Sequence, residues 1–331
     1  MITAASRSLL LLASVLLASC QQDESVILDQ AIERQIAALQ TPVPVEAWQH
    51  QVTQLFADHY EEFEQFLETA DSDQDGPATG DQLQRVLDHW YADFNRHYIL
   101  LAGQACASSQ YRLLARSDSW PLYPGYLDSL PDWPQSGLIN DTSIDLTAAA
   151  LRRQHRTTDP HEVSLGFSAL HTVLLQFRQP VERGPQELAN QDQEYPELDL
   201  QHQQQRRQQF LSAASQQLFE DIRALTAAVP LTRQHMDCGL RLTLEREGLL
   251  QAWRKQPGEY LTMPPGTLET VEDSTLQALH HVPDAVMNTW REQDSMFDAA
   301  LTAAEDGDIQ PLKALHAIQP RGNSGRQHRS D

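Results

Sequence analysis

Residues 45–67 read VEAWQHQVTQLFADHYEEFEQFL, and their apolar side chains recur at steps of three and four. Trp48, Val52, Phe56 and Phe63 therefore share one face of a helix. The same spacing recurs in three further stretches, within residues 83–101, 210–225 and 284–301, and the apolar residues of 240–253 fit a further helix less cleanly. The clear alternation of apolar and polar residues that marks half-buried strands is missing. Only 14 glycines in 331 residues also argue against many tight turns, so the sequence predicts an all-α fold.

Two interruptions divide these predicted helices. Residues 118–141 contain Pro121, Pro124, Pro131 and Pro134, too many prolines for a helix. Loops of this length in compact domains are usually functional or specially packed. Residues 179–205 are rich in Gln, Pro and Glu, which is typical of an exposed linker. We therefore expect two packed helical bundles, divided as follows: a signal peptide at 1–20, an N-terminal bundle with the proline and aromatic loop at 21–180, a linker at 181–205, a C-terminal bundle at 206–319 and a disordered tail at 320–331.

The first twenty residues resemble a bacterial lipoprotein signal. Arg7 precedes an apolar run of about ten residues, too short to span a bilayer but suited to a secretory segment. The run ends in small residues before Cys20, which the pattern predicts to be lipidated; the alternative is an ordinary signal peptide with an accidental cysteine. Gln21 after that cysteine resembles sorting to the outer membrane. We expect a periplasm-facing lipoprotein of the cell envelope, bound to the membrane through its N-terminal lipid.

The net charge bears on the possible partners, and the cysteines other than Cys20 bear on the redox compartment. The formal net charge is −22, and such a surface repels phosphate backbones, so nucleic acid is not an expected partner. Cys106 and Cys238 remain once Cys20 is lipidated. In an oxidising compartment they form a disulfide or, alternatively, remain two buried thiols.

The stretch from Trp120 to Leu175 carries a set of spaced motifs. It contains Trp-Pro-Leu, then Tyr-x-Asp, then Gly-x-Ile-Asn-Asp and, later, a helix that opens with Gly-Phe. The matching residues are Trp120, Pro121, Leu122, Tyr126, Asp128, Gly137, Ile139, Asn140, Asp141, Gly166, Phe167, Ala169, Leu174 and Leu175. In this order they resemble the imelysin family of bacterial envelope proteins.

The imelysin resemblance implies a two-bundle helical fold, a cleft between the bundles and a role in iron acquisition or handling. Other iron-uptake or envelope proteins are the partners it implies. The ligand cleft would be lined by the following residues: Trp120, Tyr126, Asp128, Asn140, Asp141, Gly166, Ser168 and His171. Asn and Asp in turns commonly bond their own backbone, so a purely local role for Asp128, Asn140 and Asp141 stays open.

One departure from the family motif bears on catalysis. The family's His-x-x-Glu pair can hold a metal ion, since side chains at i and i+3 share a helix face. Here Ser168 stands at the histidine position and His171 at the glutamate position. Serine is a poor ligand for a divalent metal, and no triad partner completes a Ser168–His171 hydrolase. We therefore expect ligand or partner binding without proteolysis, and name no catalytic residue. The alternatives are a metal-dependent peptidase with relocated ligands and a purely architectural lipoprotein.

Other candidate metal ligands follow from spacing alone. His89, Asp93 and His97 recur at i, i+4 and i+8, which makes either a metal-binding stripe or a solvated flank. Asp71 to Gly76 matches the first half of a calcium-binding EF-hand loop, but Gln82 stands where a bidentate glutamate is needed. A polar turn between helices is the alternative reading. The sequence therefore assigns no cofactor, and the candidate it leaves open is a divalent metal ion (iron, zinc or calcium).

Overall fold

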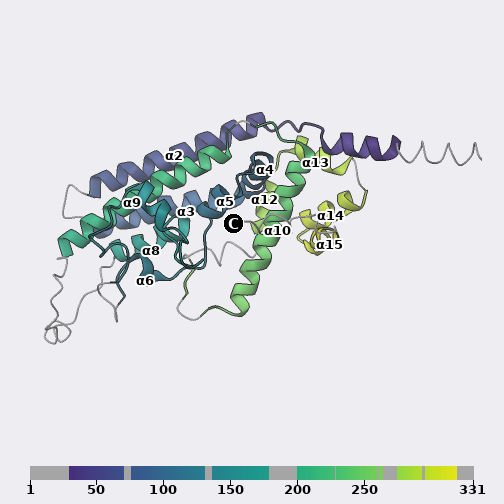
Figure 1. Ribbon diagram of the computed structural model, residues 1–331. Coiled ribbons are helices and arrows are strands. Elements are labelled where there is room, and N and C mark those ends of the chain that lie inside the picture. Colours follow the sequence, from purple (N-terminus) through teal and green to yellow (C-terminus); the bar gives the residue numbers. More distant parts are fainter. Residues whose placement is uncertain are drawn as a thin grey trace, which may run out of the picture.

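The computed structural model is built from packed helices, which confirms the all-α prediction (Figure 1). In the part of the chain that the structure describes, β-pairing is limited to two isolated antiparallel bridges, Pro42 with Thr232 and Leu122 with Thr262. The described residues are 30–70, 76–130, 136–178, 200–227, 229–258, 261–263, 274–292 and 295–318. The predicted signal peptide, Cys20, residues 71–75 of the EF-hand-like loop, residues 181–199 of the linker and the tail from 320 lie outside them.

Four helices form the central bundle. They are α2 (Glu46–Ala70), α3 (Gly76–Arg96), α8 (Phe167–Arg178) and α9 (Leu200–Leu225). Each packs against the next, α2 on α3, α3 on α8, α8 on α9 and α9 on α2, so the four close into a ring. Large side chains from every member are fully buried inside it: Phe56, Phe63, Trp90, Phe167 and Phe210. Each such aromatic contributes about 1.5–3 kcal/mol by leaving water, so this apolar face holds the bundle together.

The position of α9 differs from the predicted division into bundles. The sequence assigned residues from 206 onward to a C-terminal bundle, yet α9 packs along α2, α8 and α5. Residues 200–205 of the predicted linker are helical and belong to α9. One continuous hydrophobic cluster runs from Val43 to Leu312. The helices before residue 181 and those after residue 205 therefore share one hydrophobic core, because α9 packs its apolar face against the N-terminal helices.

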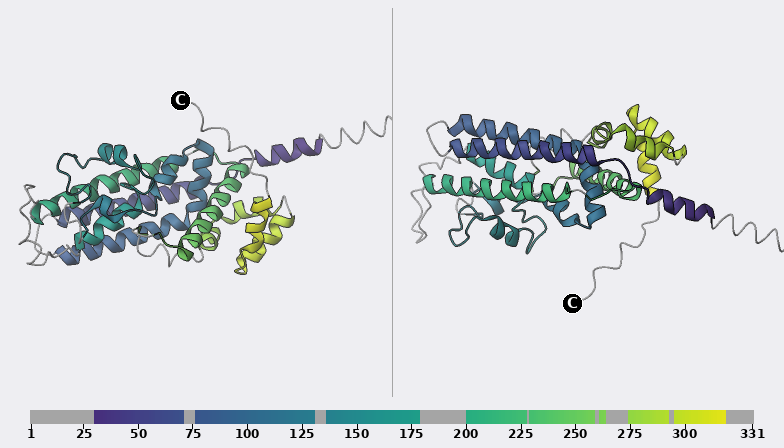
Figure 2. Two further views of the ribbon diagram at one scale, coloured as in Figure 1. Left: turned by 60° about the horizontal axis from the view of Figure 1, so that its bottom comes forward. Right: turned by 90° about the horizontal axis from the view of Figure 1, so that it is seen from above.

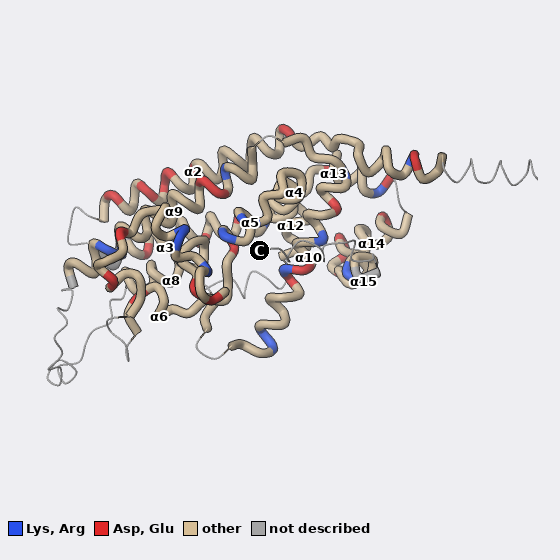
Figure 3. The backbone as a smooth tube through the Cα atoms, viewed as in Figure 1, with Lys and Arg blue, Asp and Glu red and all other residues tan. Residues whose placement is uncertain are grey.

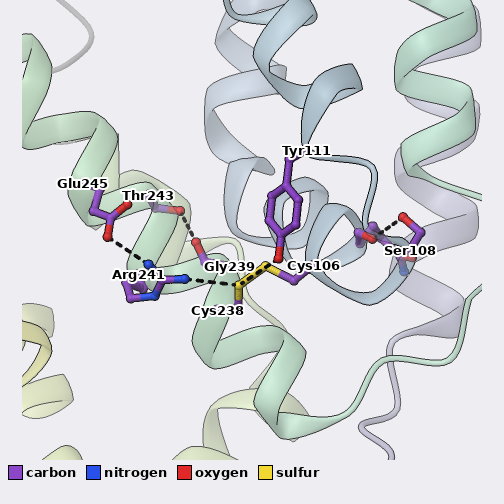
Figure 4. Close-up of a disulfide and its surroundings, with 9 residues drawn as sticks. Cys106, Ser108, Tyr111, Cys238, Gly239, Arg241, Thr243 and Glu245 are labelled. Carbon is purple, nitrogen blue, oxygen red and sulfur yellow. Dashed lines mark hydrogen bonds and ion pairs between the residues drawn. A yellow bond between two sulfur atoms is a disulfide. The ribbon is translucent and has the colours of Figure 1, made fainter. Parts of the chain in front are cut away.

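A second group of helices crosses one end of the central bundle. Its main contact joins α4 (Tyr98–Ser108) to α10 (Arg233–Lys255). Gly103 and Gly239 meet there; a Cβ on Gly239 would lie 2.7 Å from the main-chain nitrogen of Gly103 and closer still to the oxygen of Ile99. The helices therefore touch backbone to backbone. Cys106 and Cys238 form a disulfide across the same contact, 132 residues apart in sequence, which confirms one of the two sequence readings (Figure 4).

Short helices complete the molecule. On the N-terminal side they are α5 (Tyr111–Ser117), α6 (Pro124–Leu127) and α7 (Ala148–Gln154). At the C-terminal end they are α12 (Ser274–His280), α13 (Asp284–Arg291), α14 (Ser295–Glu305) and α15 (Gln310–Ile318). The C-terminal group lies at one end of the molecule, beside the projecting helical segment 30–39 (Figure 2). Among the described residues no helix has the length and apolar character needed to cross a membrane.

Candidate functional site

Ser168 and His171 lie at the junction of α8 with α3. Gly166 has a φ of 89°, and a Cβ there would lie 2.6 Å from the oxygen of Ser117. Only glycine fits this turn, which lets α8 begin at Phe167 and carries both side chains inward. Each residue is about 1% exposed. The position that corresponds to the family motif is therefore closed to solvent.

The hydrogen bonds of His171 fix its protonation. The amide nitrogen of Gln84 lies 3.0 Å from His171 Nδ1 and also donates to Asp88 at 2.7 Å. Because an NH₂ group only donates, Nδ1 accepts and the neutral ring carries its proton on Nε2. Burial lowers the pKa of His171 to about 3. Nε2 is buried and has no hydrogen-bond partner among the described residues, so the ring is a neutral core histidine that accepts a hydrogen bond from Gln84.

The proline and aromatic segment is held against α9 by arginine. Arg207 donates to both carboxylate oxygens of Asp128, at 2.6 and 3.1 Å, and both side chains are 2% exposed. Arg206 donates to four main-chain carbonyls of the same segment, those of Leu138, Ile139, Asp141 and Ile144, at 2.5–3.2 Å. A bidentate Arg–carboxylate pair adds geometric specificity to its energy. Asp128 and residues 138–144 are thus bonded in place along α9.

The other predicted cleft residues also bind protein groups. Tyr126 donates from its hydroxyl to the oxygen of Gln154 at 2.7 Å. Asn140 accepts from Gln203 and donates to Ser136. Asp141 accepts from the nitrogen and hydroxyl of Ser143, the local turn that the sequence left open as an alternative. Trp120 has a buried Nε1 without a hydrogen-bond partner in the described part of the chain. The ligand cleft stays a prediction, and the side chains of Tyr126, Asn140 and Asp141 are engaged in internal hydrogen bonds.

The structure also pairs a serine with a histidine that the sequence did not single out. His155 Nε2 lies 3.3 Å from the hydroxyl of Ser119. His155 Nδ1 accepts from the main-chain N–H of Ser164, so the ring proton is on Nε2 and points at the serine. The serine hydroxyl donates instead to the oxygen of Ala115. A general base must accept the serine proton, and this pair has the opposite polarity. Its role is to fasten the loop before α8.

The predicted stripe of His89, Asp93 and His97 does not converge. His89 is exposed. Asp93 accepts from Arg96 and pairs with His59 at 2.7 Å; desolvation opposes its charge, but these hydrogen bonds lower its pKa overall. His97 Nδ1 accepts from Trp48 Nε1, and burial lowers the pKa of His97 to about 4. Within the described ranges no three His, Cys, Asp or Glu side chains gather in a group able to hold a metal ion.

A buried cluster around Arg246 is a polar feature that sequence reasoning missed. Arg246 donates to Asp118 and to Asn95 and Tyr91, and its guanidinium lies 4.6 Å from the ring centre of Tyr98. Burial opposes its charge, yet the Asp118 carboxylate outweighs burial and raises the pKa of Arg246. The available signal was an arginine on the apolar face of a helix, between Leu240 and Leu250. Arg246 links α10 to α3 through Asn95, and to the start of the proline-rich segment through Asp118.

Arg116 makes the corresponding link to α9. Its Nε donates to Asp221 Oδ2 at 2.6 Å, and its Nη2 donates to the other oxygen. Gln217 also donates to Asp221, at 2.7 Å. With Arg207–Asp128 and Arg246–Asp118, this makes three carboxylates with under 5% side-chain exposure, each held by an arginine from another element. Together they fix residues 116–128 between α9 and α10.

The comparisons with known proteins add no relative. No protein-family model matches this chain, and no curated protein matches it either.

Proposed function

We propose that this chain is a lipid-anchored cell-envelope protein, similar to the imelysin family, that binds a ligand or partner in iron acquisition or handling without catalysing a reaction. The observation that carries the non-catalytic part is the closure of the Ser168–His171 position. A catalytic group must come within hydrogen-bond reach of its substrate. His171 is about 1% exposed, and its Nδ1 is occupied by Gln84.

The placement of the other candidate donors supports the same reading. A metal-dependent peptidase needs several protein ligands and an open coordination position. Asp93 and His97, offered by the sequence as relocated ligands, are bonded to His59, Arg96 and Trp48. One contact favours the peptidase alternative, because Asp88 lies 3.7 Å from His171 Nδ1 with its side chain half-exposed. Asp88 and His171 would supply only two ligands, whereas catalytic zinc sites use three protein ligands and structural sites use four.

Two features support the envelope location. A disulfide between Cys106 and Cys238 suits an oxidising compartment such as the periplasm. The helical segment 30–39 projects from the body (Figure 1) and exposes Ile32 and Ile36 by 45% and 50%, one turn apart. Nine residues separate Cys20 from this segment, so a lipid on Cys20 would hold its apolar stripe beside the bilayer surface, where such stripes insert.

The charge distribution bears on the class of ligand. Acidic residues recur along α2 and outnumber basic residues over the chain, 46 to 24 (Figure 3). Three arginines are neutralised by ion pairs with the buried carboxylates of Asp118, Asp128 and Asp221. The remaining field favours cationic over anionic ligands and opposes nucleic acid.

Three sets of measurements test the proposal: metal content and cleavage, lipid anchoring, and growth. Elemental analysis of the purified protein should find less than stoichiometric tightly bound metal, and casein cleavage should be no faster than in buffer. Mature protein from membranes should carry lipid on Cys20, and Cys20→Ala should release it to the soluble fraction. Loss of the gene should slow growth of the host under iron chelation, with rescue by wild type and by His171→Leu. Stoichiometric metal held through His171, or cleavage abolished by EDTA, would establish the peptidase alternative instead.

A further inference from the structure

The two sulfurs of the Cys106–Cys238 disulfide have unlike surroundings (Figure 4). Arg241 Nη2 lies 3.7 Å from Cys238 Sγ, and the hydroxyl of Tyr111 lies 4.0 Å from the same sulfur. Both are donors directed at Cys238. Two acidic side chains of the same helix are paired with arginines: Glu245 with Arg241 itself at 2.9 Å, and Asp237 with Arg233 at 3.6 Å.

The helix positions reinforce this difference. Cys106 lies in the last turn of α4, where the helix dipole disfavours negative charge. Cys238 lies in the N-terminal half of α10, away from any such end. A thiolate on Cys238 is therefore stabilised by a cation and a hydroxyl, whereas the described residues place no such donor beside Cys106. Both cysteines are partly exposed, so an external thiol can compete for the bond.

Thiol–disulfide exchange is sensitive to which sulfur leaves. The attacking thiolate forms a new bond to one sulfur, and the electron pair of the broken S–S bond departs on the other. The better-stabilised thiolate leaves faster. Attack at Cys106 with departure of Cys238 is the favoured direction here.

We propose that Cys106 is a modification site at which a dithiol oxidoreductase of the envelope exchanges with this protein, with Cys238 as the leaving and resolving thiolate. The partner thiolate bonds to Cys106 and expels Cys238; the partner's second thiol then releases Cys106, so the partner becomes a disulfide as this chain gains two thiols. In reverse, an oxidised partner loads onto Cys106 and Cys238 displaces it. This goes beyond the proposed binding function, since it concerns how the disulfide between α4 and α10 is formed and reduced.

The test uses the intact oxidised chain and reduced glutathione at neutral pH. Brief reaction, acid quenching, blocking of free thiols with a maleimide and peptide mass spectrometry locate the adducts. The expected product has glutathione on Cys106 and maleimide on Cys238, roughly threefold or more over the reverse. Equal adducts, a preference for Cys238, or no exchange by the native protein would overturn the proposal.

Variants at the neighbouring charges identify the cause. Arg241→Gln should bring the adduct ratio toward one, whereas Arg241→Lys should keep the preference for Cys106. Glu245→Gln frees Arg241 from its competing carboxylate and should keep or increase the preference. Tyr111→Phe is a milder second probe should Arg241→Gln fold poorly, and it should reduce the ratio in the same direction. An unchanged ratio in both folded Arg241→Gln and Tyr111→Phe would contradict the role given to these donors.

Discussion

Arg246 shows how a single charged residue can be kept inside this core. Its guanidinium meets the Asp118 carboxylate at 2.5 Å and also donates to Asn95 at 2.7 Å. Burying a charge without a partner is strongly unfavourable, but a paired and hydrogen-bonded charge is tolerated. The pair therefore specifies how α10 docks rather than simply adding stability, and it requires both partners to be present.

Arg246→Met should lower the free energy of unfolding by about 3–5 kcal/mol, because Asp118 would be left buried without its counter-ion. The double variant with Asp118→Leu should recover much of that loss. Glu245→Gln, which removes the exposed i, i+4 partner of Arg241, is the matched control and should cost at most about 0.5 kcal/mol. Urea denaturation measures all three, and an Arg246→Met loss no larger than that of the control would contradict the assignment.

His171 predicts a pH dependence with a defined sign. Burial lowers its folded-state pKa to about 3, below the ordinary value of 6.5. As pH falls below about 6.5, the unfolded chain binds a proton that the folded chain does not, so the free energy of unfolding falls by up to about 1.4 kcal/mol per pH unit. Above that pH its contribution is constant. His171→Leu should flatten this part of the slope in urea titrations between the two values; parallel curves for variant and wild type would be the contrary result.

At the scale of elements, the helices follow the apolar periodicity but their breaks do not. The stretch 83–101 was predicted as one helix and is divided at His97 into α3 and α4. His97 has φ −103° and ψ 12°, and its ring accepts a hydrogen bond from Trp48. The stretch 284–301 is likewise two helices, α13 and α14. Apolar residues continue across both breaks because the chain stays buried on either side.

The α4–α10 contact gives a sharp test with a control on the same helix. Gly239→Ala would place a methyl group against the backbone of α4 and should destabilise the protein by about 1–3 kcal/mol. Gly248 lies in α10 as well, with nothing within 4 Å of an added Cβ. Gly248→Ala should therefore stabilise by up to about 1 kcal/mol through helix propensity. Thermal and urea denaturation should show opposite signs; equal shifts would refute the close approach.

At the scale of the whole molecule, α9 joins what the sequence separated. It packs on α2, α8, α5 and α7, and its Arg207 and Asp221 hold the carboxylate of Asp128 and the guanidinium of Arg116. A helix that supplies both apolar contacts and the partners of buried charges belongs to the same cooperative unit. The N-terminal helices are consequently incomplete without it.

A fragment of residues 30–178 should therefore fail to unfold cooperatively, because it lacks α9 and leaves Asp128 and Arg116 without their partners. A fragment of residues 30–225 restores α9 and should show a cooperative but weaker transition than the full chain. Circular dichroism during urea denaturation compares the three. A cooperative transition in the shorter fragment would instead support the predicted division at residues 181–205.

The sequence by itself determined the helical class, the apolar faces of the long helices and the candidate chemistry, because helical periodicity and motif spacing are local properties of the chain. It did not determine the breaks at His97 and between α13 and α14, or the short helix α6 within the proline-rich stretch. Trp48, Phe56 and Phe63 indicated a buried helix face, and Gly166 before Phe167 marked the start of α8. Tertiary structure alone decided the partners. Only folding brings Arg207 to Asp128 and Arg246 to Asp118, selects the Cys106–Cys238 bond over two free thiols, and encloses His171 against Gln84. Pairing between distant residues depends on how whole helices pack, and no local spacing encodes that.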